Sequence, residues 1–280
     1  MSGRYTARTL CLEISMLVLA VVFCLPLFIL FSVALKAPED LFTDALAFPT
    51  DPHFDNFSTA WESNTGRAGG LRTALVSSLI ITGCAVTALI VIGSLCAYVI
   101  ARRPGKLTNT LYVLFVLGII VPFQLGILPL FVMFRKLGLI GTYLGMVVLW
   151  VGILTPLTVF LYTGFVRALP RDYEEAARMD GASTWRTFSR VVFPLLRPIT
   201  GTVAILTGLF IWNDFFVSLI FLGGSGRETL PVAVYSFVGE YLTQWNLVFA
   251  TVIIALLPLL LFFLIAQKQM IRGFSGGIRG

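Results

Sequence analysis

Two groups of polar residues interrupt this apolar chain, and their types and spacing suit them to bind a solute or a partner. The first is Trp212-Asn213-Asp214, inside a long apolar stretch. An indole face stacks on the apolar face of a sugar ring, while an amide and a carboxylate exchange hydrogen bonds with hydroxyl groups. An ionisable residue in a membrane span is costly unless it faces water or a partner. The triplet therefore predicts a binding position on a path for a polar solute. The alternative is that Asp214 reaches the outer interface or caps a half-helix.

Gln124 is a further candidate for such a path. It lies between Pro122 and Pro129 in another apolar stretch. Prolines free backbone carbonyl groups within a span, which is tolerated only where neighbouring helices or a water-lined cavity satisfy those groups. We therefore expect Gln124 to line a cavity, with a hydrogen bond between helices as the alternative.

The second polar group covers residues 169–194, between two apolar stretches. Asp172 and Glu175 have the spacing of a capping box with aspartate in the first position, which predicts a helix starting there. Gly181 can adopt the left-handed conformation that ends such a helix, and Ser183 can cap a second helix. The pattern predicts two short helices bent at a glycine.

The small side chains of Ala176 and Ala177 give the first of these helices a low profile. Another protein surface could therefore approach its backbone closely. We expect residues 169–194 to form a firm projection outside the apolar phase. The alternative is an amphipathic connector that only covers the membrane surface.

Composition places the chain in a membrane. Of its 280 residues, 58% are hydrophobic and 12% are charged, with a mean hydropathy of +0.92, whereas soluble domains carry about 25% charged residues. The net charge of +6 reports orientation in such a protein, so nucleic-acid binding need not be invoked. The four cysteines have no metal-ligand spacing, and His53 stands alone in a polar loop. We therefore expect no metal site and no catalytic residue.

Six long intervals lack charged residues, apart from Asp214 in the fifth, and each is long enough for a helix that crosses a bilayer. They lie between Glu13 and Lys36, Arg72 and Arg102, Lys106 and Arg135, Lys136 and Arg167, Arg197 and Arg227, and Glu240 and Lys268. The predicted fold class is an all-α integral membrane protein with six transmembrane helices.

Lysine and arginine set the expected orientation. With the N-terminus inside, most of these residues fall on the cytoplasmic side, as the positive-inside rule requires. The predicted organisation is an N-terminal stub with the first helix (1–35), an extracytoplasmic loop (36–71), a five-helix core (72–267) containing a cytoplasmic loop (168–198), and a cytoplasmic tail (268–280).

The polar projection resembles the coupling-loop motif of bacterial ABC importer permeases. The motif reads Glu175-Ala176-Ala177, three residues, Gly181, nine residues, then Val191-Val192-Phe193-Pro194, with valine and phenylalanine where the family has isoleucine and leucine. Similarity to the second permease of the carbohydrate-uptake branch extends to residues 121–124, 127–130, 137–143, 212–215 and 229–231 and to the glycine-rich C-terminus. The similarity runs from about Leu71 to the end of the chain.

This resemblance implies a type I ABC importer permease fold, in which one helix embraces a partner permease and five form the core. It implies a bacterial cytoplasmic (inner) membrane protein with both termini cytoplasmic. The implied partners are a second permease, two ATP-binding cassette subunits and an extracytoplasmic solute-binding protein. Residues coupled to the ATPase would be Glu175, Ala176, Ala177, Asp180 and Gly181, and residues on the substrate path would be Trp212, Asn213, Asp214 and Gln124.

The chain has no G-x-x-x-x-G-K-[ST] phosphate loop, so ATP with magnesium would bind to the partner ATPase and no cofactor to this chain. The predicted function is transport of a sugar or an oligosaccharide, not catalysis. One alternative keeps the architecture and changes the cargo to a polyol, a glycerol phosphodiester or another polar solute. Another is an ion-coupled secondary transporter, which needs intramembrane charges and usually an internal repeat.

Overall fold

The computed structural model describes residues 7–41, 47–62, 70–237 and 244–276, and these residues form helices and no strand. This confirms the predicted all-α class. Residues 1–6 of the predicted stub, 42–46 and 63–69 of the predicted outer loop, and 277–280 of the predicted tail lie outside the described residues.

The long helices are α1 (Ala7–Ala34), α3 (Leu71–Arg102), α6 (Tyr143–Ala168), α10 (Arg197–Trp212) and α13 (Trp245–Gly276). Between them lie shorter elements: α2 (Asp55–Glu62), α4 (Lys106–Ile120), a 3-10 turn (Phe123–Gly126), α5 (Ile127–Lys136), α7 (Asp172–Met179), α8 (Thr184–Thr187), a π-helical turn (Phe188–Val192), α9 (Phe193–Leu195), α11 (Phe216–Leu222) and α12 (Leu230–Ser236).

Four described helices are long and apolar enough to cross a membrane, over Thr9–Ala34, Leu71–Arg102, Tyr143–Ala168 and Trp245–Phe262. Two bent pairs reach that length only when each is taken as one span. Lys106–Ile120 meets Phe123–Lys136 at 90°, and Thr184–Leu195 meets Arg197–Trp212 at 72°. By length and composition the described residues therefore provide four to six spans. The predicted fifth span differs from the second bent pair, because it began at Arg197 and left Thr184–Leu195 in the projection.

The third predicted span is not the continuous helix that its charge-free interval suggested. Helix α4 ends at Ile120, and Val121 is extended, with φ −72° and ψ 120°, directly before Pro122. A residue that precedes proline avoids the α conformation because the proline ring crowds it. The chain resumes in the 3-10 turn and then in α5, nearly perpendicular to α4.

The fifth predicted span is also shorter than its interval. Helix α10 ends at Trp212, and α11 begins at Phe216 after a turn that contains Asn213 and Asp214. The apolar stretch up to Arg227 therefore holds two helices, because the polar pair supplies the turn that separates them.

Helices α3 and α6 form the centre of the bundle. Gly93 of α3 lies so close to α6 that an added Cβ would overlap with Cγ2 of Thr158. A glycine at this crossing lets the two helices approach closely, as small residues do between membrane helices. Around this pair, Leu89, Trp150 and Phe221 belong to one buried cluster, and Tyr98 and Phe188 belong to a second cluster.

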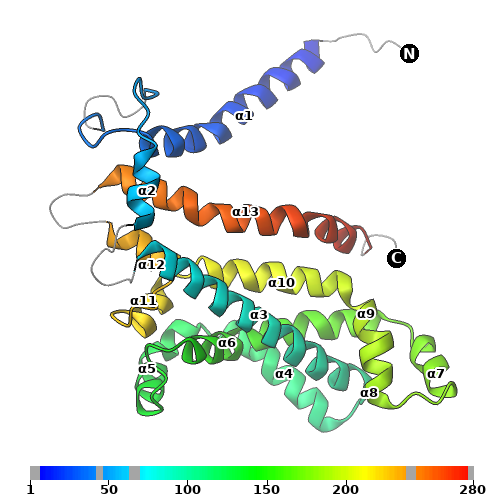
Figure 1. The fold of residues 1–280 in the computed structure, drawn as a ribbon. Helices are drawn as coiled ribbons and strands as arrows, with labels where there is room; N and C mark the ends of the chain where they lie inside the picture. Colours follow the sequence, from blue (N-terminus) through cyan, green and yellow to red (C-terminus); the bar gives the residue numbers. More distant parts are fainter. Residues whose placement is uncertain (1–6, 42–46, 63–69, 238–243, 277–280) are drawn as a thin grey trace.

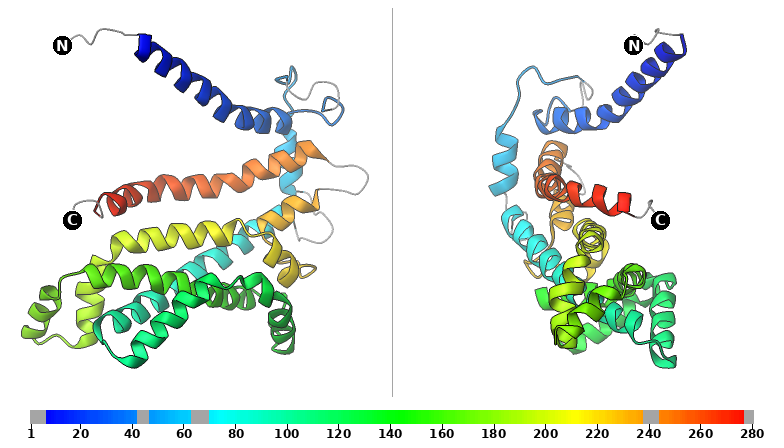
Figure 2. Two further views of the ribbon diagram at one scale, coloured as in Figure 1. Left: turned by 180° about the vertical axis from the view of Figure 1, so that it is seen from behind. Right: turned by 90° about the vertical axis from the view of Figure 1, so that its right-hand side faces the viewer.

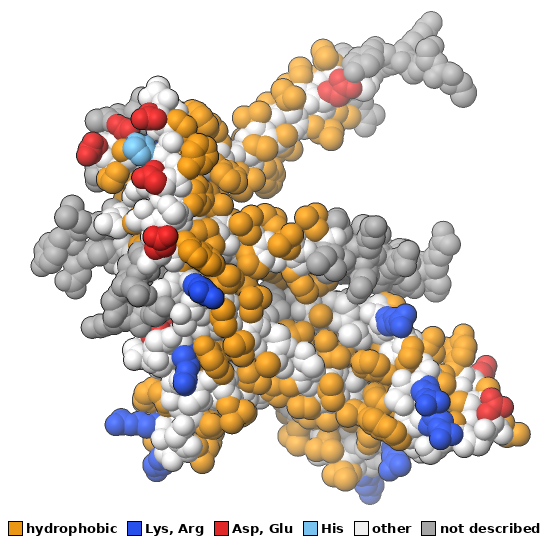
Figure 3. Space-filling model, viewed as in Figure 1, with side chains coloured by type: hydrophobic (Ala, Val, Ile, Leu, Met, Phe, Trp, Pro, Cys, Tyr) orange, Lys and Arg blue, Asp and Glu red, His pale blue; other side chains and the backbone are white. Residues whose placement is uncertain are grey.

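The long helices run between two ends of the molecule (Figure 1). Helices α7, α8 and α9 lie at one end, together with the start of α1 and the end of α13, and α2, α5, α11 and α12 lie at the other end. Apolar side chains cover most of the visible surface between these ends, while charged side chains gather towards them (Figure 3). This arrangement is typical of a bundle that spans a bilayer.

Helix α1 stands away from the rest of the bundle (Figure 2). In this single chain, no residue of the 18-residue apolar stretch of α1 is buried. Only its C-terminal part packs, through Leu30 and Ala34, against Leu247 and Val248 of α13. The side-chain amide of Asn56 in α2 fixes this end, because it donates to the carbonyl oxygens of Ala34 and Lys36 at 3.0 and 2.9 Å.

Candidate functional site

The predicted projection begins where the sequence indicated, at Asp172, the first residue of α7. The predicted capping box is wrong, however, because no side chain caps this helix and Arg171 is the residue in the cap position. The carbonyl oxygen of Arg171 instead accepts hydrogen bonds from the backbone N–H groups of Glu174 and Glu175. Asp172 lies inside the first turn, where its carboxylate still interacts favourably with the positive end of the helix dipole.

Gly181 ends α7 as predicted. Its φ is +79°, in the left-handed region. The N–H of Gly181 donates to the carbonyl of Arg178 at 3.0 Å, and the N–H of Ala182 donates to that of Ala177 at 3.0 Å. This pair of bonds is the Schellman motif, which satisfies the last carbonyl groups of a helix. The bend between the two short helices is therefore fixed by the backbone.

Ser183 caps α8 as predicted, since its Oγ accepts from the N–H of Arg186 at 3.4 Å. The segment that follows contains a feature that the sequence did not indicate, the π-helical turn from Phe188 to Val192. Phe188 and Val192 are buried, and the Phe188 ring lies 5.2 Å from that of Tyr98 in α3. The turn thus anchors the projection on the end of α3.

The residues predicted to couple with a partner lie together on the outer surface of the projection. Glu175, Ala176, Asp180 and Gly181 are exposed, and Ala177 is partly buried. Large apolar side chains accompany them, since Tyr173, Met179 and Trp185 are 53%, 88% and 65% exposed. An exposed apolar patch at the end of a polar projection is typical of a surface that docks another protein.

Glu174, the residue next to the predicted Glu175, lies on the opposite, buried side of α7. It is 5% exposed. Its Oε2 accepts from the hydroxyl of Tyr98 at 2.9 Å, and its Oε1 accepts from Nε of Arg102 at 2.6 Å. Arg102 also donates through Nη2 to the carbonyl oxygen of Leu169 at 3.0 Å.

The energies of the two ion pairs of Glu174 differ greatly. Arg178, one turn along α7, approaches Glu174 Oε2 only to 4.0 Å, and its side chain is 57% exposed, so this pair contributes about 0.3–0.5 kcal/mol. In the other pair the side chains of Arg102 and Glu174 are 9% and 6% exposed. Removal of one partner from a buried pair costs about 3–5 kcal/mol, because it leaves an uncompensated charge. Sequence reasoning missed this pair because its members are 72 positions apart.

Asp214 lies in the turn between α10 and α11 and acts as a cap there. Its Oδ1 accepts from the N–H of Val217 at 3.2 Å, and its Oδ2 accepts from the N–H and the hydroxyl of Ser218 at 2.9 and 3.0 Å. Two of the alternatives predicted for Asp214 were an interfacial position and the cap of a half-helix, and its hydrogen bonds are those of a cap. The carboxylate is partly buried.

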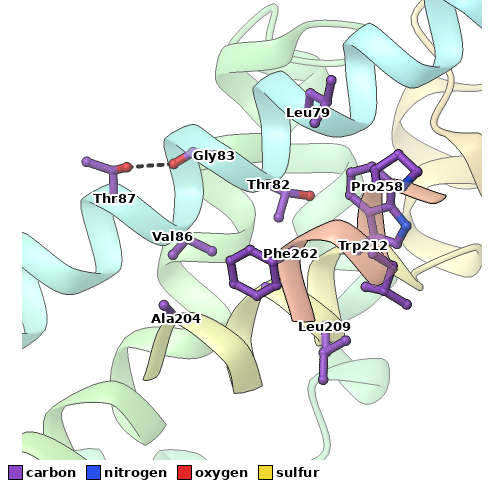
Figure 4. Close-up of a pocket in the computed structure, with 12 residues that line it drawn as sticks. Leu79, Thr82, Gly83, Val86, Thr87, Ala204, Leu209, Trp212, Pro258 and Phe262 are labelled. Atoms are coloured by element: carbon purple, nitrogen blue, oxygen red, sulfur yellow. Dashed lines mark hydrogen bonds between the residues drawn. The ribbon is translucent and has the colours of Figure 1, made fainter. Parts of the chain in front are cut away.

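Trp212 lies between two hollows of the molecule. One has a volume of about 290 Å³ and is formed by α3, α10 and α13, with Thr82 and Val86 on one wall and Phe262 on another. Figure 4 shows the Trp212 ring beside Pro258 at the edge of this hollow. The second hollow, of about 380 Å³, is lined by Trp212, Asn213 and Tyr235. The structure thus places two of the predicted path residues at one cavity system.

Gln124 does not share this position. It lies in the 3-10 turn between α4 and α5, where its side chain is exposed, and it lines neither hollow. Asp214 also lies outside the residues that line the two hollows. No group of three or more histidine, cysteine, aspartate or glutamate residues within the described ranges could hold a metal ion.

Residues 89–275 match the family described as binding-protein-dependent transport system inner membrane component. The chain belongs to this family. The matched part includes the whole projection, the turn at Asp214 and the second hollow beside Trp212, while the α3 wall of the first hollow, within residues 79–87, precedes it. The chain is thus a multi-pass membrane component of a binding-protein-dependent transport system.

Curated members of this permease family cover nearly the whole chain. The melibiose/raffinose/stachyose import permease protein MelC of Bacillus subtilis is 39% identical over 275 residues, which is 97% of this chain and 98% of that protein. The probable starch degradation products transport system permease protein AmyC of Thermoanaerobacterium thermosulfurigenes is 32% identical and covers 93% of each chain. The prediction of a permease of the carbohydrate-uptake branch is confirmed by these relatives.

A solved structure has the same permease fold. A chain of a bacterial ABC transporter involved in the import of the acidic polysaccharide alginate superposes with a TM-score of 0.80 over 95% of this chain and 99% of that chain. The sequence identity is 18%. This likeness shows a shared fold, and the predicted type I importer architecture agrees with it.

Proposed function

We propose that this chain is one permease subunit of an ATP-driven ABC importer, and that it moves a sugar or an oligosaccharide across the bacterial cytoplasmic membrane. The observation that carries this proposal is the 39% identity to an oligosaccharide import permease over 97% of the chain. The Trp212 cavity system supports it, because an indole beside amide and hydroxyl groups is a suitable wall for a sugar.

The proposed complex contains a second permease, two ATP-binding cassette subunits and an extracytoplasmic solute-binding protein. The exposed apolar surface of helix α1 in the single chain is evidence for a second permease, because such a surface can pack against another membrane protein. A structure of the bacterial alginate ABC transporter in complex with its pentasaccharide-bound periplasmic protein superposes with a TM-score of 0.63 over 93% of this chain. That neighbour supports a binding-protein partner here.

The proposed orientation places the projection, the N-terminus and the C-terminus in the cytoplasm. The start of α1, the end of α13 and α7–α9 lie at one end of the bundle (Figure 1), as this orientation requires. ATP with magnesium would bind to the partner ATPase. The energy of hydrolysis would enter this chain through the exposed face of α7, which carries Glu175, Ala176 and Asp180.

Trp212, Asn213, Asp214 and Gln124 are the proposed residues of the substrate path. Trp212 and Asn213 would contact the sugar in the hollows that they line. Asp214 would hold the turn that presents them, through its hydrogen bonds to α11. Gln124 is exposed at the bend between α4 and α5, away from the lining of both hollows, so its place on the path rests on the prolines that flank it.

The cargo is tested with the complex reconstituted in proteoliposomes together with its binding protein. Uptake of radiolabelled melibiose and raffinose is compared with uptake of glycerol and a glycerol phosphodiester. The proposal expects saturable uptake of a sugar and none of the other solutes. Uptake of a non-sugar solute alone would refute the sugar assignment. Uptake that persists without ATP but collapses with the ion gradient would identify a secondary transporter instead.

A further inference from the structure

Helix α3 contacts both the projection and the cavity beside Trp212. Its C-terminal residue, Arg102, reaches Glu174 of α7, while Thr82, Val86 and Thr87 in its middle line the 290 Å³ hollow. Helix α3 runs from the projection end towards the end that holds α12 (Figure 1). With 32 residues it is about 48 Å long at 1.5 Å per residue.

Both ends of α3 are held by polar contacts. Near its start, the hydroxyl of Ser78 accepts from the N–H of Leu230 at 2.9 Å, and the hydroxyl groups of Ser77 and Tyr143 lie 3.1 Å apart. At its other end, Tyr98 and Arg102 lie on one face, four residues apart, and both donate to the carboxylate of Glu174. A displacement of α7 is therefore passed directly to α3.

The contact of Glu174 with Tyr98 and Arg102 is defined by hydrogen-bond geometry as well as by charge. Each oxygen of the Glu174 carboxylate has its own donor, Arg102 for one and Tyr98 for the other. Arg102 binds in addition the carbonyl oxygen of Leu169, the residue that follows α6. The three contacts join the ends of α3, α6 and α7 at one buried point. Apolar side chains alone would let these helices slide, whereas charged donors and acceptors define one register.

We propose that Tyr98, Arg102 and Glu174 form a latch that locks the projection to α3, so that movement imposed on α7 moves the wall of the cavity. This inference rests on the proposed function and names positioning residues for it. Glu174 is buried and bonded within the subunit, whereas the adjacent Glu175 is exposed on the face proposed to meet the ATPase. The two neighbouring glutamates thus have separate roles, one in transmission and the other in docking.

The test compares Glu174→Gln with the wild-type complex in proteoliposomes. Three quantities are measured: the amount of ATPase that copurifies, the rate of ATP hydrolysis, and the number of sugar molecules taken up for each ATP. The latch predicts normal copurification, ATP hydrolysis within twofold of wild type, and a loss of about tenfold in sugar per ATP, the size expected for the coupling of contacting residues. Asp172→Asn, which removes an exposed charge from the same helix, is the matched control and should change sugar per ATP less than twofold.

Glu175→Gln should give the opposite pattern. Loss of this exposed carboxylate weakens copurification of the ATPase, while the complexes that remain keep a normal ratio of sugar to ATP. If Glu174→Gln lost ATPase in proportion to uptake, or kept a normal ratio, the latch would be refuted. A wild-type complex with no ATP-driven uptake would instead refute the proposed function.

A double-mutant cycle separates the latch from a general loss of stability. Glu174→Gln, Arg102→Gln and the double variant are compared by sugar per ATP. Residues of one latch give a double variant no worse than either single variant, whereas independent residues give multiplied losses. Tyr98→Phe keeps the ring against Phe188 and removes one bond to Glu174. It is the variant to measure if the charge variants do not reach the membrane, and a wild-type ratio in it would refute the latch.

Discussion

Replacement of Gly181 tests whether the bend of the projection matters for docking. Gly181 has φ +79°, and an added Cβ would meet no atom within 4 Å. An alanine side chain would therefore fit, and its whole cost would come from the left-handed backbone, about 1–2 kcal/mol. That free energy corresponds to a factor of about 5–30 in the population of the bent conformation.

The expected readout is the affinity of the purified permease pair for its ATPase. The apparent dissociation constant rises as the binding-competent conformation is depopulated, so Gly181→Ala should weaken binding by at most about 5–30-fold. Gly181→Asn should stay near wild type, because asparagine tolerates the left-handed region. Gly181→Pro should abolish binding, since proline fixes φ near −65° and removes the N–H that donates to Arg178.

Each variant is checked for its amount in the membrane, so that a failure of insertion is not mistaken for a failure of docking. If Gly181→Pro bound the ATPase with wild-type affinity, the bend would have no part in coupling. If alanine and asparagine reduced the affinity equally, the effect would follow from the loss of glycine itself and not from the sign of φ.

Three further predictions follow from single contacts. Asp214→Ala should destabilise the turn before α11 by about 0.5–2 kcal/mol, seen as a lower Tm. Asp214→Asn keeps one of the two acceptor oxygens that face α11 and should restore part of the Tm and of the sugar affinity. A sugar affinity as low as that of Asp214→Ala despite a restored Tm would contradict a role confined to holding the turn. Gly93→Ala should cost about 1–3 kcal/mol, because its Cβ would overlap with the Thr158 methyl group. Adding Thr158→Ser removes that methyl group and should recover most of the Tm, and no recovery would contradict the close approach. Asn56→Leu should cost about 1–3 kcal/mol of stability, because the carbonyl of Ala34 loses its donor. It should also reduce copurification of the second permease. An unchanged yield of that permease would show that α1 is held by its apolar contacts alone.

The sequence indicated those features of the projection that depend on neighbouring residues. The start of α7, the left-handed Gly181 and the cap at Ser183 each involve residues within five positions of one another. Hydrogen bonds of this range are set by the local order of residue types. The proposed docking face was therefore predictable from one sequence.

Features that depend on distant residues were not predictable. Nothing in the neighbourhood of Glu174 shows that it is the buried member of a pair, because its partners Tyr98 and Arg102 lie 76 and 72 positions away. The prolines of the third span were visible, but the 90° bend between α4 and α5 depends on how α5 packs. Charge-free intervals likewise measure the length of an apolar stretch and do not reveal turns within it, such as that at Asn213 and Asp214.

The most direct measurement is sugar uptake by proteoliposomes that hold the permease pair, with loaded binding protein outside and ATP inside, either with or without the ATPase subunits. We predict ATP-dependent accumulation of sugar only when the ATPase is present, and its loss when this chain carries Gly181→Pro. Equal uptake by the permease pair alone would contradict the account, because transport would then not depend on an ATPase bound at the projection.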